Sequence, residues 1–227
     1  MKRVFICGDD TYPLHHPVDE IRKELYAVLD KPPLAVTADT EHFEGMDAED
    51  LAQFDLVVMY SDHWPDKIRT SHQLERAFVH YIALGGNLLV LHMPDMMDTP
   101  EFAQLVGCRR QPDSGRPVTT QLLFLPAVGH PVSERLEPFS LQEQQLCLEY
   151  CPMTERNDFL LAQTPAGNQF PVGWTSGFGM GKTAYLMLGH GKQSFANPSF
   201  QLKLRRMMLY LTHKEETRGG NRNSDSV

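Results

Sequence analysis

Short apolar runs alternate with stretches of helical periodicity, and this alternation constrains the fold more than any other feature of the chain. Almost entirely apolar runs lie at 3–7, 34–38, 55–60 and 87–92. Continuous apolar runs are typical of strands in parallel sheets, because helices cover both faces of such sheets. The segments between the runs carry apolar residues three and four positions apart, which predicts the crossover helices of βαβ units. We therefore expect a mostly parallel α/β sheet.

The sequence also marks the ends of three helices. One is expected to begin near His16, because Pro17 suits a first helical turn. A second runs from about Thr70 or Ser71 to Gly85 and Gly86, where glycine can form a left-handed C-terminal cap. A third begins at Asn197 and Pro198. Its apolar face comprises Phe200, Leu204, Met207, Met208 and Leu211.

The second half of the chain differs, because its strand-like runs follow one another with little helix between them. These runs lie at 118–125, 144–149, 158–164, 170–175 and 182–188. Such a succession favours antiparallel strands added to the same sheet. Since no repeat or flexible linker interrupts the sequence, we expect a single domain over 1–213. Residues 214–227 lack an apolar anchor and are expected to be a disordered tail.

Composition excludes several classes of protein. The chain has 227 residues, of which 41% are hydrophobic and 22% charged, and these values are typical of a soluble globular protein. A net charge of −8 argues against binding to nucleic acid or anionic lipid. No run approaches the roughly 18 apolar residues that a membrane-spanning helix needs. The four cysteines form no CxxC pair and no signal peptide is recognised, so reduced thiols in the cytoplasm are expected.

Histidines are unusually numerous, at 10 in an otherwise ordinary acidic chain. In open α/β sheets, ligands bind beyond the carboxyl ends of the strands. Several histidines fall at such strand ends or in loops: His15, His16, His63, His92, His130 and His190. Imidazole suits proton transfer near neutral pH and also metal coordination, for which Asp62 or Asp95 could add a carboxylate.

The structural interpretation of these histidines stands beside the functional one. A single loop histidine is more often a surface or capping residue than a catalytic one. His42, His72, His80 and His213 are assigned structural roles, because two of them lie within a helical stretch and one borders the tail. No HExxH or comparable spacing supports a metal site.

Four segments carry recognisable motifs: CGDDTYPLHHPVDEI, YIALGGNLLVLHMP, GHPVSERLEPFSLQEQQL and PVGWTSGFGMGKTAYLMLGHGKQSFANPSFQLKLRRMMLYL. In their order and spacing they resemble the ThuA-like family, which is named for trehalose utilisation, and the similarity covers most of 1–212. The resemblance implies a flavodoxin-like α/β fold, akin to the class I glutamine amidotransferase domain. That fold is a three-layer sandwich whose central sheet is mostly parallel, with antiparallel additions in the C-terminal half. A role in carbohydrate metabolism is also implied, with trehalose-like disaccharides or their keto derivatives as substrates.

Carried over residue by residue, the resemblance places a pocket at His16, His92 and His190. These three are the expected catalytic groups and the expected ligands of any divalent metal, such as zinc. His130 matches the family's His-Pro motif and is interpreted as a residue that shapes its loop. The expected sugar-binding residues are Tyr12, His63, Trp64, Asp95, Gln144 and Gln145.

The sequence departs from the family after Phe139, where family members show an acidic pair followed by an aromatic residue. The corresponding residues here are Gln144, Gln145 and Cys147. Amides cannot take up a proton and bind metals poorly. Glu143 or Glu149 would supply a carboxylate if the register were shifted.

Two functions remain open. The first is a sugar-processing hydrolase, lyase or isomerase that uses histidine acid/base groups or a divalent metal. The second is a carbohydrate-binding or complex-forming protein without catalysis. Glutamine hydrolysis is not expected, because His92 stands where an amidotransferase has its cysteine, and Cys7 is interpreted as a buried strand residue. A small sugar is the expected ligand, while a homo-oligomer is left open.

Two further residues or segments allow more than one interpretation. The glycines of GFGMGK at 177–182 resemble a phosphate-binding loop, but a turn between two strands explains them better. Trp174 suits either core packing or stacking against a sugar ring.

Overall fold

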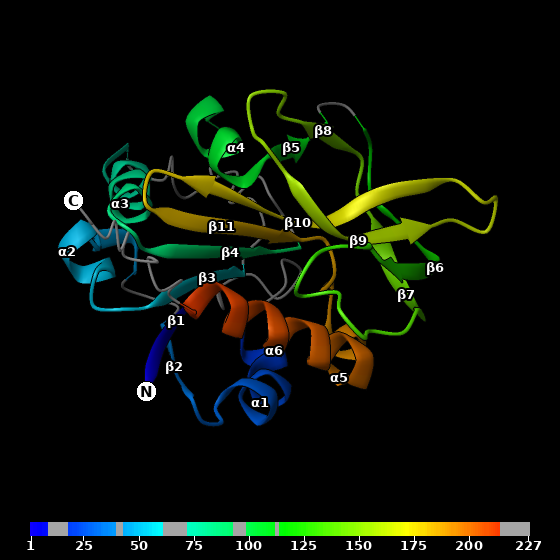
Figure 1. Ribbon diagram of the computed structural model, residues 1–227, viewed down its shortest axis with the longest axis horizontal. Helices are drawn as coiled ribbons and strands as arrows, with labels where there is room; N and C mark the ends of the chain where they lie inside the picture. The colour runs from blue at the N-terminus through cyan, green and yellow to red at the C-terminus, as the bar shows by residue number, and fades with distance from the viewer. Residues whose placement is uncertain (9–17, 40–42, 61–71, 93–98, 112–113, 214–227) are drawn as a thin grey trace, which may run out of the picture.

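A computed structural model describes residues 1–8, 18–39, 43–60, 72–92, 99–111 and 114–213. Five strands in this part of the chain form the parallel half of the main sheet (Figure 1). They are β1 (Lys2–Gly8), β2 (Leu34–Asp39), β3 (Leu56–Tyr60), β4 (Asn87–Leu91) and β11 (Gly181–Leu186). Parallel pairing joins β2 to β1, β1 to β3, β3 to β4 and β4 to β11. The four N-terminal apolar runs therefore form the strands that their composition predicts.

The antiparallel half extends the same sheet beyond β11. Its strands are β10 (Gln169–Phe178), β9 (Asn157–Gln163), β6 (Val118–Pro126) and β7 (Phe139–Gln145). The order across the described sheet is β2-β1-β3-β4-β11-β10-β9-β6-β7. A separate small sheet pairs β5 (Cys108–Arg110) with β8 (Leu148–Tyr150). The prediction of antiparallel additions in the C-terminal half is confirmed.

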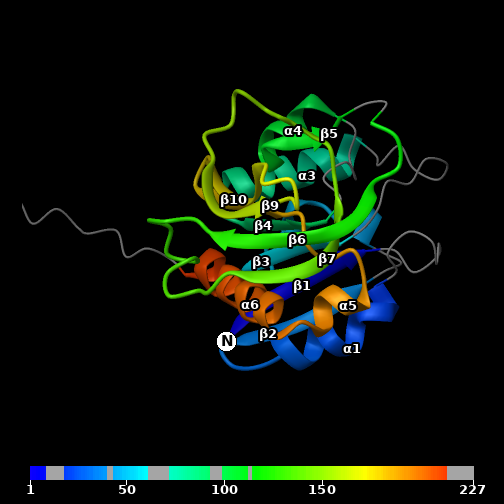
Figure 2. The same cartoon turned by 90° about the vertical axis from the view of Figure 1, so that its right-hand side faces the viewer.

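Helices cover both faces of the sheet and complete the three layers (Figure 2). On one side lie α1 (Val18–Leu29), α5 (Lys192–Ala196) and α6 (Pro198–Thr212). On the other lie α3 (His72–Ala83) and α4 (Pro100–Val106), and α2 (Ala48–Leu51) packs against α3. A short 3-10 turn, η1, spans Phe43–Gly45. This is the flavodoxin-like α/β architecture that the resemblance implies.

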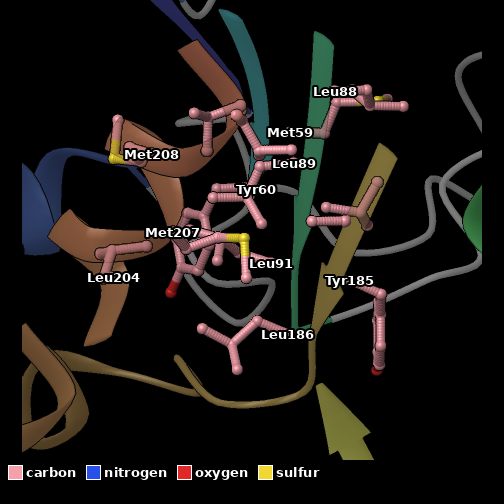
Figure 3. Packing of buried hydrophobic residues seen from close by; sticks show 14 of the residues in the cluster. Met59, Tyr60, Leu88, Leu89, Leu91, Tyr185, Leu186, Leu204, Met207 and Met208 are labelled. Carbon is pink, nitrogen blue, oxygen red and sulfur yellow. The ribbon is translucent and has the colours of Figure 1, made fainter. Parts of the chain in front are cut away.

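Part of the core lies where α6 packs against the parallel strands. Leu204, Met207 and Met208 of α6 face Leu89 and Leu186 across one side of the sheet, as Figure 3 shows. All five side chains are almost fully buried. Burying side chains of this size contributes about 1.5–3 kcal/mol each. The apolar face predicted for this helix is therefore the face that packs.

Local chemistry explains where α6 begins. The Asn197 side chain accepts hydrogen bonds from the backbone N–H groups of Ser199 at 2.9 Å and Phe200 at 3.1 Å. Pro198 occupies the first turn, where its missing N–H costs nothing. The helix start expected near His16 lies outside the described residues, and α1 is described from Val18 onward.

One predicted strand has the wrong limits. The run 144–149 was expected to be one strand, but β7 ends at Gln145 and β8 begins at Leu148. The chain changes sheets between them, because β7 pairs with β6 whereas β8 pairs with β5. An apolar run alone does not show where a chain leaves one sheet for another.

The glycine-rich segment 177–182 forms the turn between β10 and β11, as its interpretation as a strand turn predicts. A Cβ atom on Gly181 would lie 2.1 Å from the carbonyl oxygen of Gly86. Glycine is therefore needed for close packing against the end of α3, and no phosphate site is required to explain it.

Two other points of the sequence analysis bear on the described structure. No helix in the described segments is long and apolar enough to cross a bilayer. The stretch 214–227, expected to be a disordered tail, lies outside the described residues.

Candidate functional site

His92 follows β4 directly and has an unusual backbone conformation. Its φ angle is +64°, in the left-handed region that residues other than glycine seldom adopt. Its N–H donates to the Leu186 carbonyl at 2.8 Å, and its own carbonyl accepts from the Tyr185 hydroxyl at 2.7 Å. Both partners belong to β11. The neighbouring parallel strand thus holds the backbone of His92 at the point where β4 ends.

The ring of His92 is fixed as firmly as its backbone. Nδ1 lies 2.9 Å from the carbonyl oxygen of Met187, and Nε2 lies 3.2 Å from Oε1 of Gln144. A carbonyl can only accept, so Nδ1 carries a proton and donates it. Nε2 then faces the Gln144 amide in one of two ways. A charged imidazolium donates to Oε1, or a neutral ring accepts from the amide NH₂ group once the amide is turned over.

His190 lies beside His92. It follows Gly189 in the connection between β11 and α5, and the two imidazole rings have centroids 5.2 Å apart and planes tilted by 48°. Gly189 has a φ angle of +114°, which an L-residue with a side chain would adopt only under strain. The structure therefore brings together two of the three predicted pocket histidines, at the carboxyl ends of adjacent strands.

Glu143 also lies at this site, although the strand predicted at 144–149 begins one residue after it. Its side chain is completely buried, and each carboxylate oxygen accepts two hydrogen bonds. Oε1 accepts from the backbone N–H groups of Gln144 at 3.0 Å and His190 at 3.2 Å. Oε2 accepts from the N–H of Gly189 at 3.0 Å and the hydroxyl of Ser194 at 2.7 Å. A carboxylate, which can only accept, matches these four donors.

The curvature of the sheet explains how the edge strand β7 reaches the end of β11. Although β11 and β7 are separated by three strands in the sheet, the β6–β7 hairpin arches across the end of the molecule at which α5 lies (Figure 2). Alternation along β7 then directs Glu143 and Gln144 to opposite faces. Glu143 accepts hydrogen bonds from the turn after β11, and the Gln144 amide lies within hydrogen-bond distance of the His92 ring.

A sequence signal could have identified Glu143. Within β7, Phe139, Leu141 and Glu143 alternate on one face, and the first and last of these are buried. A carboxylate in line with inward-facing apolar residues indicates a buried acidic group. Because the predicted strand begins at residue 144, it leaves out this alternation over residues 139–143. Glu143, which the sequence analysis named as an alternative carboxylate, thus lies at the site together with Gln144.

The remaining predicted site residues fall into two groups. Gln145 lies at the end of β7, and among the described residues no hydrogen bond joins it to either histidine. The others lie outside the described residues: Tyr12, His16, His63, Trp64 and Asp95.

His130 and Trp174 have structural partners. The backbone N–H of Val132 donates to Nδ1 of His130, and Nε2 of His130 lies 3.0 Å from the Thr175 hydroxyl. Burial lowers the pKa of His130 below its usual value. The Trp174 indole is fully buried and donates to the carbonyl of Val106 at 2.8 Å. These contacts support loop shaping for His130 and core packing for Trp174.

The described donors do not by themselves fit a metal ion. In the part of the chain that the structure describes, no group of three or more histidine, cysteine or carboxylate side chains is arranged to hold one. Nδ1 of His92 donates to a carbonyl, and both oxygens of Glu143 already accept two hydrogen bonds. A zinc site needs at least three protein ligands. Zinc coordination by His16, His92 and His190 thus stays a prediction.

Comparison with known proteins places the chain in a family. The ThuA family model, described as trehalose utilisation, matches residues 3–211. A ThuA-like protein from Parabacteroides merdae ATCC 43184 is similar in structure, with a TM-score of 0.71 and 17% identity over 93% of this chain and 90% of that one. None of the curated proteins matches the chain.

Two further solved structures show how widely the fold occurs. A protein described as cytoplasmic, from Salmonella typhimurium, has a TM-score of 0.67 and 13% identity over 93% of this chain and 99% of that one. A β-galactosidase from Rahnella sp. R3 has a TM-score of 0.60 and 13% identity, and the match covers 92% of this chain and 31% of that one. At such identities the likeness shows the fold alone. The family model spans most of the sequence, and the chain therefore belongs to the ThuA family of trehalose utilisation.

Proposed function

We propose that this protein acts on a sugar or keto-sugar of the trehalose-like disaccharide class, with His92 as its acid/base group. The observation that carries the proposal is the geometry of the His92 ring. The Met187 carbonyl fixes the proton on Nδ1, which leaves Nε2 as the nitrogen that can take up and release a proton. The family's link to trehalose utilisation supports a carbohydrate substrate.

This geometry suits proton transfer on a polyol. Hydrolysis, elimination and isomerisation of a keto-sugar all require a proton to be removed from one atom or delivered to another. A histidine with a fixed tautomer performs either task near neutral pH, and such catalysis typically contributes about 10²- to 10⁴-fold in rate. His190, whose ring is 5.2 Å away, offers a second imidazole for the opposite transfer.

The same strand end argues against glutamine hydrolysis. An amidotransferase needs a thiol on the strained turn that follows this strand. Here the residue with the left-handed conformation is His92, and Cys7 is fully buried within β1. The described geometry offers proton transfer at this turn in place of nucleophilic attack.

One observation favours the alternative, a binding module without catalysis. The side chain that faces Nε2 of His92 is the amide of Gln144, and an amide hydrogen-bonds hydroxyl groups without exchanging protons. Carboxylates at this position would support proton relay, whereas an amide suits recognition. The two functions use the same residues and differ only in turnover.

The test is a screen of trehalose, other disaccharides and their oxidised keto derivatives by thermal shift and by turnover. We expect at least one of these sugars to be converted, and we expect the His92→Asn variant to lose about 10²- to 10⁴-fold of that activity. Asparagine tolerates the left-handed conformation better than most residues, so the fold is retained. His80→Asn, at an exposed site on α3, is the matched control and keeps full activity.

Each outcome of the screen has a distinct meaning. Turnover that depends on His92 supports the enzyme. Stabilisation by a sugar without turnover supports the binding module. A protein that neither binds nor converts any of these sugars contradicts both.

The proposal places the protein in the cytoplasm. The four cysteines form no disulfide within the described residues, which suits a reducing compartment. A similar protein from Salmonella typhimurium is described as cytoplasmic.

A further inference from the structure

The four hydrogen bonds of Glu143 join three separate parts of the fold. One donor, the N–H of Gln144, lies on β7 itself. The N–H groups of Gly189 and His190 belong to the turn after β11, and the Ser194 hydroxyl belongs to α5. Since Glu143 is completely buried, water does not compete for these bonds. The carboxylate is the common acceptor at which an edge strand, a strand-end turn and a helix meet.

Oxygen Oε1 connects the two halves of the candidate site. It accepts from the backbone N–H of His190, which carries one imidazole, and from the backbone N–H of Gln144, whose side chain meets the other. A displacement of this single atom would therefore move both the His190 backbone and the Gln144 amide. Oxygen Oε2 holds the side chain in place through Gly189 and Ser194.

Only a carboxylate fits this arrangement of donors. An amide in its place would turn its NH₂ group either toward the N–H groups of Gln144 and His190 or toward the N–H of Gly189, and at least one buried backbone donor would lose its acceptor. An unsatisfied buried polar group costs about 1–3 kcal/mol, more than a typical hydrogen bond contributes. Hydrogen bonds to an ionised acceptor are also stronger than neutral ones. Replacing Glu143 by glutamine thus weakens the hydrogen bonds that join β7, the turn after β11 and α5, while the side-chain volume stays nearly the same.

We propose that Glu143 is a positioning residue that sets the spacing between the His92–Gln144 pair and His190. Its role in catalysis rests on the function proposed above, but its effect on the geometry of the two histidines does not. The carboxylate itself accepts hydrogen bonds from the backbone of the turn at Gly189 and His190, and not from the imidazole rings. It acts on any substrate through the groups that it holds.

The first experiment measures geometry in the ligand-free protein. Ring resonances of His92 and His190 are assigned by NMR with the help of the His92→Asn and His190→Asn variants. We expect Glu143→Gln to shift the ring signals of both histidines, and Ser194→Ala, which removes one of the four donors, to shift them less.

Two matched controls remove similar groups whose hydrogen bonds join other parts of the fold. Glu75→Gln alters another buried carboxylate, which accepts from the Thr99 hydroxyl. Ser133→Ala removes another buried serine, whose hydroxyl donates to the Phe159 carbonyl at 2.5 Å. Both controls are expected to lower stability and to leave the His92 and His190 signals unchanged.

The second experiment measures turnover, where a sugar has been found to react. We expect Glu143→Gln to lower kcat by up to about 100-fold with a smaller change in KM, because misplaced groups impair the transition state more than binding. The Glu75→Gln control keeps kcat within a few-fold of the wild type.

The outcomes separate this inference from the proposed function. If the ring signals of His92 and His190 are the same in Glu143→Gln as in the Glu75→Gln control, the positioning role is wrong. If Glu143→Gln does not fold, Ser194→Ala decides, and unchanged rings in that variant overturn the proposal. If no sugar is bound or converted, the proposed function fails, while the NMR experiment still tests the role of Glu143.

Discussion

At the scale of single residues, backbone strain and side-chain hydrogen bonding coincide at His92. A left-handed conformation costs a residue other than glycine about 1–3 kcal/mol. His92 adopts it with its N–H, its carbonyl and both ring nitrogens engaged by defined partners. Glycine would adopt the same backbone without strain but would offer no imidazole. The strain is thus offset by contacts that also orient the ring, as expected at a functional site.

His130 shows the opposite pattern, because its contacts are those of a structural residue. Its Nδ1 accepts from the backbone N–H of Val132, so the proton lies on Nε2 and is donated to the Thr175 hydroxyl. The rings of Phe159 and Tyr210 flank it at centroid distances of 5.5 Å and 5.2 Å. A neutral ring satisfies this environment, whereas a second proton would have no acceptor at Nδ1.

This environment gives His130 a predictable pH dependence. Burial lowers its pKa below the ordinary value of 6.5, so below that pH the unfolded chain binds a proton that the folded chain does not. The contribution to stability is therefore fully present above about pH 6.5 and is lost as the pH falls, by at most about 1.4 kcal/mol per pH unit. We expect His130→Gln to be less stable than the wild type near pH 7.5 and to lose less stability between about pH 6.5 and 5.

Urea unfolding over this pH range measures the effect. The His80→Gln variant, altered at an exposed position on α3, serves as the control and keeps the wild-type dependence. Parallel pH profiles for His130→Gln and the wild type would show that His130 is not the group responsible.

At the scale of elements, α6 and the strand β7 meet around a buried lysine. Lys203 is 2% exposed, and its ammonium lies 4.0 Å from the centre of the Phe139 ring and 3.4 Å from the carbonyl oxygen of Glu137. Desolvation, with a smaller contribution from Arg206, lowers the pKa of Lys203 from 10.5 to about 8. The cation–π contact and the carbonyl offset only part of the cost of burying this charge.

Replacing Lys203 by methionine should therefore stabilise the protein. The unfolded chain holds the lysine proton up to about pH 10.5 and the folded chain only up to about pH 8, so the charge penalises the folded state at neutral pH. We expect Lys203→Met to raise the free energy of unfolding by about 1 kcal/mol at pH 7, with the gain shrinking as the pH rises from 8 toward 10.5.

Urea unfolding at pH 7 and pH 10 tests this, with Lys23→Met as the control because Lys23 is exposed on α1. A Lys203→Met variant that is less stable than the wild type at pH 7 would show that the contacts with Phe139 and Glu137 outweigh desolvation.

The elements also show how much of this molecule its sequence predicts. Apolar runs locate β1 to β4, Gly85 and Gly86 mark the end of α3, and the Asn197 cap locates the start of α6, because local chemistry decides those limits. The strand-end rule brings His92 and His190 to the same edge for the same reason. The role of Glu143 is not predicted from the sequence, because it depends on where β7 stops pairing with β6. Contacts between segments far apart in the chain set that limit.

At the scale of the whole molecule, the site depends on both halves of the sheet. His92 and His190 follow parallel strands, while Glu143 and Gln144 come from the last antiparallel strand. The buried apolar side chains form one cluster that runs from β1 through β4 and β11 to β6 and β9. Curvature of the sheet, which no local pattern encodes, brings the edge strand β7 to the carboxyl ends of the central strands β4 and β11. Displacing either half would therefore separate the groups of the site.

The continuity of the core leads to a prediction about unfolding. If 1–213 is one domain, far-UV circular dichroism and the fluorescence of Trp174 should report a single coincident transition in urea. The measurement uses a Trp64→Phe background, because the sequence has two tryptophans and the signal should come from Trp174, which is fully buried in β10. Met207→Ala creates a cavity where α6 covers the parallel strands and should cost about 2–5 kcal/mol, shifting both signals equally. Leu202→Ala, at a 47% exposed position on the same helix, should change stability by less than about 0.5 kcal/mol. Should Met207→Ala shift the circular dichroism transition and leave the Trp174 transition in place, the two halves unfold separately, and the hydrogen bonds of Glu143 then join two units that fold independently.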